Sequence, residues 1–256
     1  MTSSAHEYRP AHRKALTSPP PVSEWEKPSL FLDFDGTLVA IADHPQAIEV
    51  AAILPGLLAR LNEALCGRLA IVSGRAIADL DRFLAIPSLT MAGSHGGELR
   101  TGGSAAIEAL ADPVPPIIEQ SLRDLAARHG DLLVETKPFS IAIHYRTRPE
   151  AGPEILDYAT RLAASAGLVL KPGKMVAELA MPGIDKGRAV GTFLQMPAFK
   201  GSRPVFVGDD ITDEDAFRSV LDHEGGGVLV GPERETAALW RLNAVSDVHH
   251  WLEAAV

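Results

Sequence analysis

Cysteine is almost absent from this chain of 256 residues, in which Cys66 is the only one. A single cysteine cannot form an intramolecular disulfide or supply a zinc site built from several thiolates. No apolar run approaches the ~18 residues that a membrane-spanning helix needs. The polar N-terminal segment also lacks the apolar stretch of a signal peptide. We therefore expect a protein that does not associate with membranes and that resides in the cytoplasm.

Positive charge is also scarce. The 24 lysines and arginines are outnumbered by 33 acidic residues, which gives a formal net charge of −9. A chain of this charge repels nucleic-acid phosphates, so we do not expect a nucleic-acid partner. Four of the seven lysines fall between residues 137 and 186, where they indicate either a local anion site or solvated surface.

Strand-like and helix-like segments alternate in two parts of the chain. The apolar run Leu30–Leu32 predicts a buried strand, and a helix over 55–66, a strand over 69–72 and a helix over 75–84 follow it. The same alternation returns from residue 186 to the end of the chain. This order is typical of an α/β fold in which helices cover both faces of a parallel sheet.

Residues 103–181 follow a different pattern. A helix over 115–129 precedes two strand-like runs, and a helix over 150–166 precedes two more. The repeated helix–strand–strand order predicts an α+β domain inserted into the core. We expect 28–102 and 182–256 to form that core. The polar, proline-containing segment 1–27 is expected to be a poorly ordered arm.

Acidic residues stand at the ends of the predicted strands. Asp33 and Asp35 follow the first strand, Ser73 follows the second, Lys186 opens a helix, and three aspartates lie in the segment 209–213. The carboxyl ends of parallel strands share one edge of a sheet, so these residues are expected to converge. Each alone is more simply a cap or turn residue. Together, carboxylates suit a hard ion such as Mg²⁺, and lysine with a hydroxyl suits phosphoryl oxygens.

The order and spacing of these residues resemble the haloacid dehalogenase superfamily. The motifs are DFDGTL at 33–38 and VGDDITDEDAF at 207–217, with Ser73 and Lys186 between them. The resemblance implies a Rossmann-like core, dependence on Mg²⁺ and a mechanism through an aspartyl phosphate. It also implies that Asp33 is the nucleophile and that Asp35 acts first as general acid and then as general base.

The same resemblance assigns the remaining motif residues. Gly36 would free the backbone to turn and Thr37 would brace the loop. Ser73 and Lys186 would hold phosphoryl oxygens, and Lys186 would also counter the charge of Asp33.

A metal site is implied as well. Mg²⁺ would be bound by Asp33, the carbonyl of Asp35 and Asp209, and Asp210 and Asp213 would support these ligands from behind. Because Asp209 and Asp210 are adjacent, the sequence leaves open which of them faces the metal.

Five further stretches resemble the trehalose-6-phosphate phosphatase family: VSGR at 72–75, AGSHGGELR at 92–100, ETKPFSIAIHYR at 135–146, KPGKMVAEL at 171–179 and GIDKGRAV at 183–190. Within them, Gly97 stands where we expect alanine. The resemblance implies that the inserted domain is a cap over the core and that the partner is a small sugar phosphate. Separately, we expect a monomer. Besides Asp33, Asp35 and Gly36, the implied substrate-binding residues are Arg75, His95, Gly96, Glu98, Glu135, Lys137, His144, Arg146, Lys174 and Glu178.

Two other interpretations stay open. A related phosphatase for sucrose 6-phosphate or mannosyl-3-phosphoglycerate would share the core and differ in its cap contacts. A catalytically silent sugar-phosphate-binding regulator would share the fold, although no motif residue is missing here. A dinucleotide-binding protein is excluded because no G-x-G-x-x-G follows the first strand.

Overall fold

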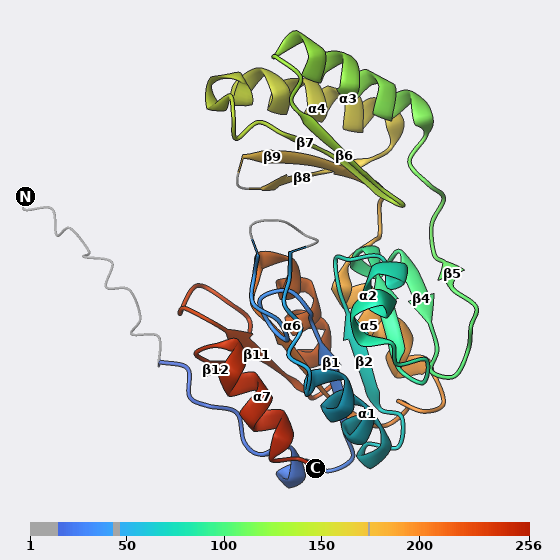
Figure 1. Ribbon diagram of the computed structural model, residues 1–256, viewed down its shortest axis with the longest axis vertical. Helices are drawn as coiled ribbons and strands as arrows, with labels where there is room; N and C mark the ends of the chain where they lie inside the picture. Colours follow the sequence, from blue (N-terminus) through green and yellow to red (C-terminus); the bar gives the residue numbers. More distant parts are fainter. Residues whose placement is uncertain (1–14, 43–46, 174) are drawn as a thin grey trace, which may run out of the picture.

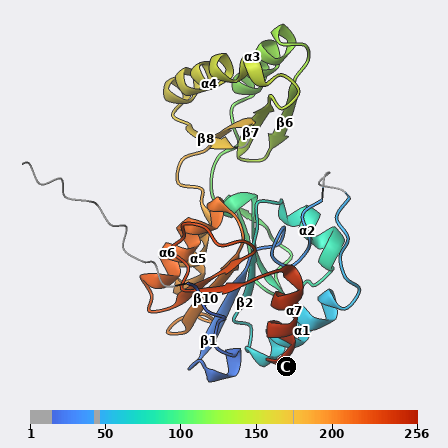
Figure 2. The ribbon, with the colours of Figure 1, turned by 90° about the vertical axis from the view of Figure 1, so that its left-hand side faces the viewer.

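The computed structural model describes residues 15–42, 47–173 and 175–256, and it forms two lobes (Figure 1). An eight-stranded sheet is the centre of the larger lobe, and a four-stranded sheet belongs to the smaller one. The chain leaves the larger lobe and returns to it, so that two segments connect the lobes (Figure 2). The predicted α/β fold, a parallel-sheet core with an α+β unit inserted into it, is confirmed.

The strands of the larger sheet come from both ends of the chain. They are β1 (Pro28–Leu32), β2 (Leu69–Val72), β3 (Thr90–Gly93), β4 (Glu98–Arg100), β5 (Glu108–Ala109), β10 (Arg203–Gly208), β11 (Gly226–Val230) and β12 (Trp240–Leu242). Their spatial order is β12-β11-β10-β1-β2-β3-β4-β5. The strands from β12 to β3 run parallel, whereas β4 and β5 are antiparallel to their neighbours.

Helices cover both faces of this sheet. They are α1 (Leu54–Ala64), α2 (Ile77–Leu84), α5 (Lys186–Gln195), α6 (Glu214–Leu221) and α7 (Val245–Glu253). Strand β1 shows how the faces are divided, because Leu30 and Leu32 pack with α1, α2 and α7 whereas Phe31 packs with α5 and α6. Burial on both faces explains why the central strands read as continuous apolar runs. None of the helices in the described ranges is long and apolar enough to cross a membrane.

The smaller lobe, called the cap lobe from here on, contains the two predicted helix–strand–strand units. Its elements are α3 (Pro116–Arg128), β6 (Leu133–Lys137), β7 (Ser140–His144), the 3₁₀ turn η3 (Pro149–Ala151), α4 (Gly152–Ala166), β8 (Val169–Gly173) and β9 (Val176–Ala180). The antiparallel strands have the order β6-β7-β9-β8. Both helices pack on the outer face of this sheet, so its other face is turned toward the larger lobe (Figure 1).

Four strands are missing from the sequence prediction: β3, β4, β5 and β12. All are short, with two to four residues. Each extends a sheet whose neighbouring strands already offer hydrogen-bonding edges. Tertiary context of this kind decides strand formation where the local pattern is weak.

The segment before β1 packs on the core. Residues 1–14 of the predicted arm lie outside the described residues, but for residues 15–27 the prediction of poor order is wrong. The Trp251 Nε1–H donates to the carbonyl of Pro20 at 2.9 Å, and the 3₁₀ turn η1 (Val22–Glu24) leads to the buried Trp25. The polar composition of the segment hid these apolar anchors.

Trp25→Ala is expected to lower the free energy of unfolding by about 3 kcal/mol, because truncating a buried aromatic residue leaves a cavity. The Trp25 ring meets that of Trp240 edge-on at 5.1 Å, and the Arg203 guanidinium lies 5.0 Å from its centroid. Urea denaturation measures the change. Glu24→Ala, at the neighbouring exposed residue, is the control. Its free energy of unfolding should stay within about 0.5 kcal/mol of that of the unmodified chain. Equal stability of the two variants would contradict the packing of this segment.

Candidate active site

Asp33 and Lys186 meet at the carboxyl edge of the larger sheet. Asp33 directly follows β1, and Lys186 is the first residue of α5. The Lys186 Nζ donates to Asp33 Oδ1 at 2.7 Å, and both side chains are buried. Thr37 Oγ1 donates to the other carboxylate oxygen at 3.3 Å, which braces the loop as predicted. Burial raises the pKa of Asp33 well above its usual range, although the Lys186 charge opposes this shift.

Asp213 is the second carboxylate on Lys186. Its Oδ1 accepts a hydrogen bond from Lys186 Nζ at 2.6 Å, and its Oδ2 accepts from the backbone N–H groups of Asp209 and Asp210, both at 2.9 Å. Burial alone would lower the pKa of Lys186, but the charges of Asp213 and Asp33 outweigh it and raise that pKa above its ordinary value. Lys186 is therefore a charged link between the loops that follow β1 and β10.

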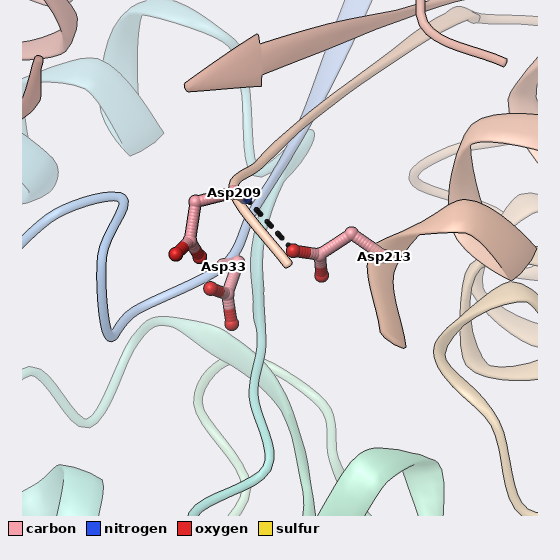
Figure 3. A group of neighbouring side chains, drawn as sticks. All are labelled: Asp33, Asp209 and Asp213. Atoms are coloured by element: carbon pink, nitrogen blue, oxygen red, sulfur yellow. Dashed lines mark hydrogen bonds between the residues drawn. The ribbon is translucent and has the colours of Figure 1, made fainter. Parts of the chain in front are cut away.

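Asp209 and Asp210 have different surroundings. Asp210 is exposed, and its carboxylate accepts from the Ile211 N–H and caps the 3₁₀ turn η4 (Ile211–Asp213). The Asp209 side chain points toward Asp33 (Figure 3). Carboxylate oxygens of Asp33, Asp209 and Asp213 lie within 4.8 Å of one another. Of the two adjacent aspartates, it is therefore Asp209 and not Asp210 that belongs to this acidic cluster.

Gly36 makes room for the Asp209 carboxylate. Its φ of +79° is in the left-handed region that favours glycine, and a Cβ there would lie 2.1 Å from Asp209 Oδ2. Conformation and space both require glycine at this turn.

The charges of the acidic cluster are unbalanced. Asp33, Asp209 and Asp213 bring three carboxylates to one site, and Lys186 is paired with two of them. Burial, together with the charges of Asp213 and Asp210, raises the pKa of Asp209 to about 6, and Asp209 Oδ1 is buried without a hydrogen-bond partner. An all-oxygen donor set that carries excess negative charge suits a hard divalent cation. These residues therefore fit Mg²⁺, with Asp33 and Asp209 as the side chains placed to hold it.

Asp35 is paired with Arg75. The Arg75 Nε donates to Asp35 Oδ2 and Nη2 donates to Oδ1, both at 2.6 Å. The guanidinium lies 5.9 Å from the ring centroid of Phe34 and 5.4 Å from that of Phe83. A two-pronged ion pair fixes orientation as well as distance. Arg75 thus orients Asp35, which the sequence did not indicate.

Ser73 and His95 lie side by side at the ends of β2 and β3. The buried Ser73 Oγ accepts from the N–H of Arg75 at 3.1 Å, and the Ser73 carbonyl accepts from the N–H of His95 at 2.9 Å. The His95 ring packs on Gly74, where a Cβ would lie 2.7 Å from its Cε1. Burial and the Lys186 charge lower the pKa of His95 to about 3, so the ring is neutral near pH 7.

A cavity of about 420 Å³ lies between this edge and the cap lobe. Asp35, Arg75 and His95 line it from the larger lobe, and Glu135 and Lys137 line it from β6. These five predicted residues from the two lobes therefore face one shared space.

Polar side chains on the inner face of the cap sheet hold one another in place. Glu178 Oε1 accepts from Lys137 Nζ at 3.2 Å and from Ser140 Oγ at 2.6 Å. His144 Nε2 and Glu135 Oε2 are 3.0 Å apart, and this hydrogen bond lowers the pKa of Glu135. Such a network presents several donors and acceptors and suits a polyhydroxyl ligand.

Glu98 and Arg146 are not among the residues that line this cavity. Glu98 accepts the backbone N–H of Ile77 at 2.9 Å and so holds the start of α2. Arg146 is exposed just beyond the end of β7, and Lys174 lies outside the described residues. Gly96, at the end of the turn η2 (Ser94–Gly96), approaches the carbonyl oxygen of Asp185, where a Cβ would lie 2.7 Å away.

Two residues of the site, Ser140 and Asp79, are not among the residues predicted from the sequence. Ser140 could have been predicted, because a two-residue turn at 138–139 places it directly opposite Lys137 in the hairpin. Its hydroxyl donates to Glu178. Asp79 lines the cavity from the first turn of α2 and stands in no recognisable motif.

Comparison with known proteins agrees with this arrangement. Residues 31–246 match the family model described as trehalose-phosphatase. The chain belongs to the trehalose-phosphatase family. It is 37% identical over 241 residues to the trehalose-6-phosphate phosphatase of Escherichia coli (strain K12), covering 93% of this chain and 89% of that relative.

This member of the trehalose-phosphatase family is also similar in fold to solved structures. A trehalose-6-phosphate phosphatase from Aspergillus fumigatus is similar with a TM-score of 0.65 and 25% identity, covering 91% of this chain and 94% of the other. A haloacid dehalogenase-like hydrolase from Bacteroides thetaiotaomicron is similar with a TM-score of 0.68 and 17% identity, covering 89% and 99%. The predicted haloacid dehalogenase type of fold is confirmed.

Lys186→Met is expected to lower the free energy of unfolding of this trehalose-phosphatase family member by about 3–5 kcal/mol, because two buried carboxylates lose their shared cation. Urea denaturation in buffer without divalent ions measures the change. Lys200→Met is the matched control at an exposed lysine and should change stability by less than about 0.5 kcal/mol. Similar values for the two variants would contradict the role of Lys186 as a structural link.

Proposed function

We propose that this chain hydrolyses trehalose 6-phosphate to trehalose and inorganic phosphate, with Asp33 as nucleophile and Mg²⁺ as cofactor. The observation that carries the proposal is the pairing of Asp33 with Lys186 at a sheet edge that faces a polar cap across one cavity. Membership of the trehalose-phosphatase family supports the substrate. The relative from E. coli is named for the same ester.

In the first step, an Asp33 oxygen attacks phosphorus and the bond from phosphorus to the sugar oxygen breaks. Asp35 protonates the departing sugar oxygen, so that trehalose leaves as an alcohol. Lys186 keeps Asp33 in place and, with the Ser73 hydroxyl, binds oxygens of the phosphoryl group as its charge spreads. The product of this step is an acyl phosphate on Asp33.

In the second step, Asp35 removes a proton from a water molecule that attacks the acyl phosphate. The bond from phosphorus to the Asp33 oxygen breaks, which restores the carboxylate and releases phosphate. Two displacements on a fixed carboxylate divide one high barrier into two lower ones. Arg75 holds Asp35 by both oxygens at the cavity rim, an arrangement that suits the carboxylate that acts as base in this second step.

Mg²⁺ would be held by Asp33, Asp209 and the carbonyl of Asp35. Asp213 would position Asp209 by accepting a hydrogen bond from the backbone N–H of Asp209. When bound, the ion supplies positive charge against the phosphoryl oxygens and between the clustered carboxylates. Asp210 supports the same loop by capping η4.

The cap lobe supplies the recognition of the sugar in this proposal. Glu135, Lys137, His144 and Glu178 offer charged and polar groups that hydrogen-bond hydroxyls and disfavour sugars that lack them. His95, neutral near pH 7, adds a donor or an acceptor from the other side of the cavity. We also assign Gly96, in the same turn as His95, to the substrate-binding set, and Arg75 lines the cavity beside it.

The remaining assignments belong to the same proposal. We assign residues 103–181 to the cap domain and residues 28–102 and 182–256 to the catalytic core. We also propose a monomer in the cytoplasm that binds a small sugar phosphate and does not associate with membranes. The net charge of −9 argues against a nucleic-acid partner.

Phosphate release in the presence of Mg²⁺ tests the function. We expect strong preference for trehalose 6-phosphate over glucose 6-phosphate, sucrose 6-phosphate and mannosyl-3-phosphoglycerate. Addition of EDTA should abolish turnover. Asp33→Asn should lower kcat by about 10³-fold or more, because the amide cannot form the acyl phosphate.

Asp157→Asn, at an exposed position on the outer helix α4, is the matched control and should keep full activity. Preferred turnover of another ester on the panel would contradict the substrate and keep the core mechanism. If no ester is hydrolysed by the unmodified chain, the enzymatic proposal fails and a silent sugar-phosphate-binding role takes its place.

A further inference from the structure

Phe139 is a buried aromatic residue in the turn between β6 and β7. Three clusters of buried apolar side chains fill the two faces of the larger sheet and the helix-covered face of the cap sheet. Phe139 belongs to none of these three clusters as they are formed by the described residues. A ring that is 6% exposed and lies outside each apolar core must be buried by some other contact.

Gly97 of the larger lobe provides that contact. A Cβ on Gly97 would lie 2.3 Å from Cδ2 of the Phe139 ring and 2.9 Å from its Cγ. The Gly97 backbone has φ −76° and ψ −19°, which any residue adopts. Space for the ring, and not backbone conformation, therefore requires glycine here. Gly97, the position at which the family resemblance leads us to expect alanine, is thus the residue on which the Phe139 ring packs.

The turn that carries Phe139 is tied to the polar face of the cap lobe. Lys137 and Ser140 flank the turn, and both donate to Glu178 Oε1. The Phe139 carbonyl accepts from the N–H of Met181, just beyond β9, at 2.9 Å. The backbone that carries the ring is therefore held by the same contacts as the groups proposed to bind the sugar.

The loop beneath the ring is tied to the catalytic edge. The Gly97 N–H donates to the Ser94 carbonyl at 3.2 Å. The adjacent Gly96 lies against the carbonyl oxygen of Asp185, whose side chain caps the helix that begins with Lys186. Phe139 thus rests on a loop whose position is set by the same helix that carries Lys186.

We propose that the contact of Phe139 with Gly97 sets the position of the cap's polar face relative to the catalytic edge, which makes Gly97 a specificity-determining residue. This inference rests on the proposed function, because it concerns sugar recognition at the same site. A methyl group at position 97 displaces the ring and with it Lys137 and Glu178, while Asp33 and its partners stay in place.

The test compares two substrates of different size. For Gly97→Ala, KM for trehalose 6-phosphate should rise by about tenfold or more, since small displacements of binding groups are costly. The kcat/KM for p-nitrophenyl phosphate, which has no sugar for the cap to bind, should change by less than about twofold. Gly191→Ala is the matched control, because the nearest atom to its added Cβ, Ser219 Oγ, is 4.0 Å away, and both parameters should be unchanged.

A second variant identifies the cause. Phe139→Ala removes the ring, so adding Gly97→Ala to it should raise KM for trehalose 6-phosphate by less than about twofold. An unchanged KM in the single Gly97→Ala variant overturns the proposal. A tenfold penalty that persists without the ring also overturns it, because the effect would then arise elsewhere in the loop.

Thermal unfolding separates loss of folding from loss of position. A Gly97→Ala protein with a lowered Tm and equal losses toward both substrates overturns the proposal in favour of general damage to the loop. If the unmodified chain prefers another sugar phosphate, the substrate in the proposed function fails, and the same comparison is made with that ester. The two failures are therefore distinguishable.

Discussion

The structure depends above all on one buried ammonium group placed between two buried carboxylates. Lys186 contacts Asp33 at 2.7 Å and Asp213 at 2.6 Å, and these residues come from three separate elements of the larger lobe. Burying an unpaired charge costs several kcal/mol, so each member of this triad requires the others. The nucleophile proposed for catalysis is thereby held at a fixed point by the same contacts that join the two halves of the core.

The surrounding loops follow from this constraint. Asp213 uses its second oxygen to bind two backbone N–H groups, which turns Asp209 toward Asp33 and leaves Asp210 to cap η4. The negative charge that Lys186 does not balance makes the cluster suitable for a divalent cation. The chain also returns from the cap lobe just before Lys186, so cap and catalytic edge are joined at the helix on which the triad depends.

Much of this could be read from the sequence, because the motifs reflect local rules. The run before Asp33 had to be a buried strand, and the repeated helix–strand–strand order defined the cap lobe. The choice between Asp209 and Asp210 could not be read, since hydrogen bonds to Asp213 decide it. Two further contacts could not be read from the sequence: the ion pair of Arg75 with Asp35 and the packing of Phe139 on Gly97. Each joins segments about 40 residues apart. For residues 15–27, polar composition masked burial that only the folded core provides.

The stereochemical course at phosphorus tests the central claim, that Asp33 is held in place to act as a nucleophile. The measurement uses trehalose 6-thiophosphate whose phosphorus is made chiral with oxygen isotopes, hydrolysed in isotopically labelled water. Two successive in-line displacements, the first by Asp33 and the second by water, predict retention of configuration. Inversion would show a single direct attack by water and would contradict the account.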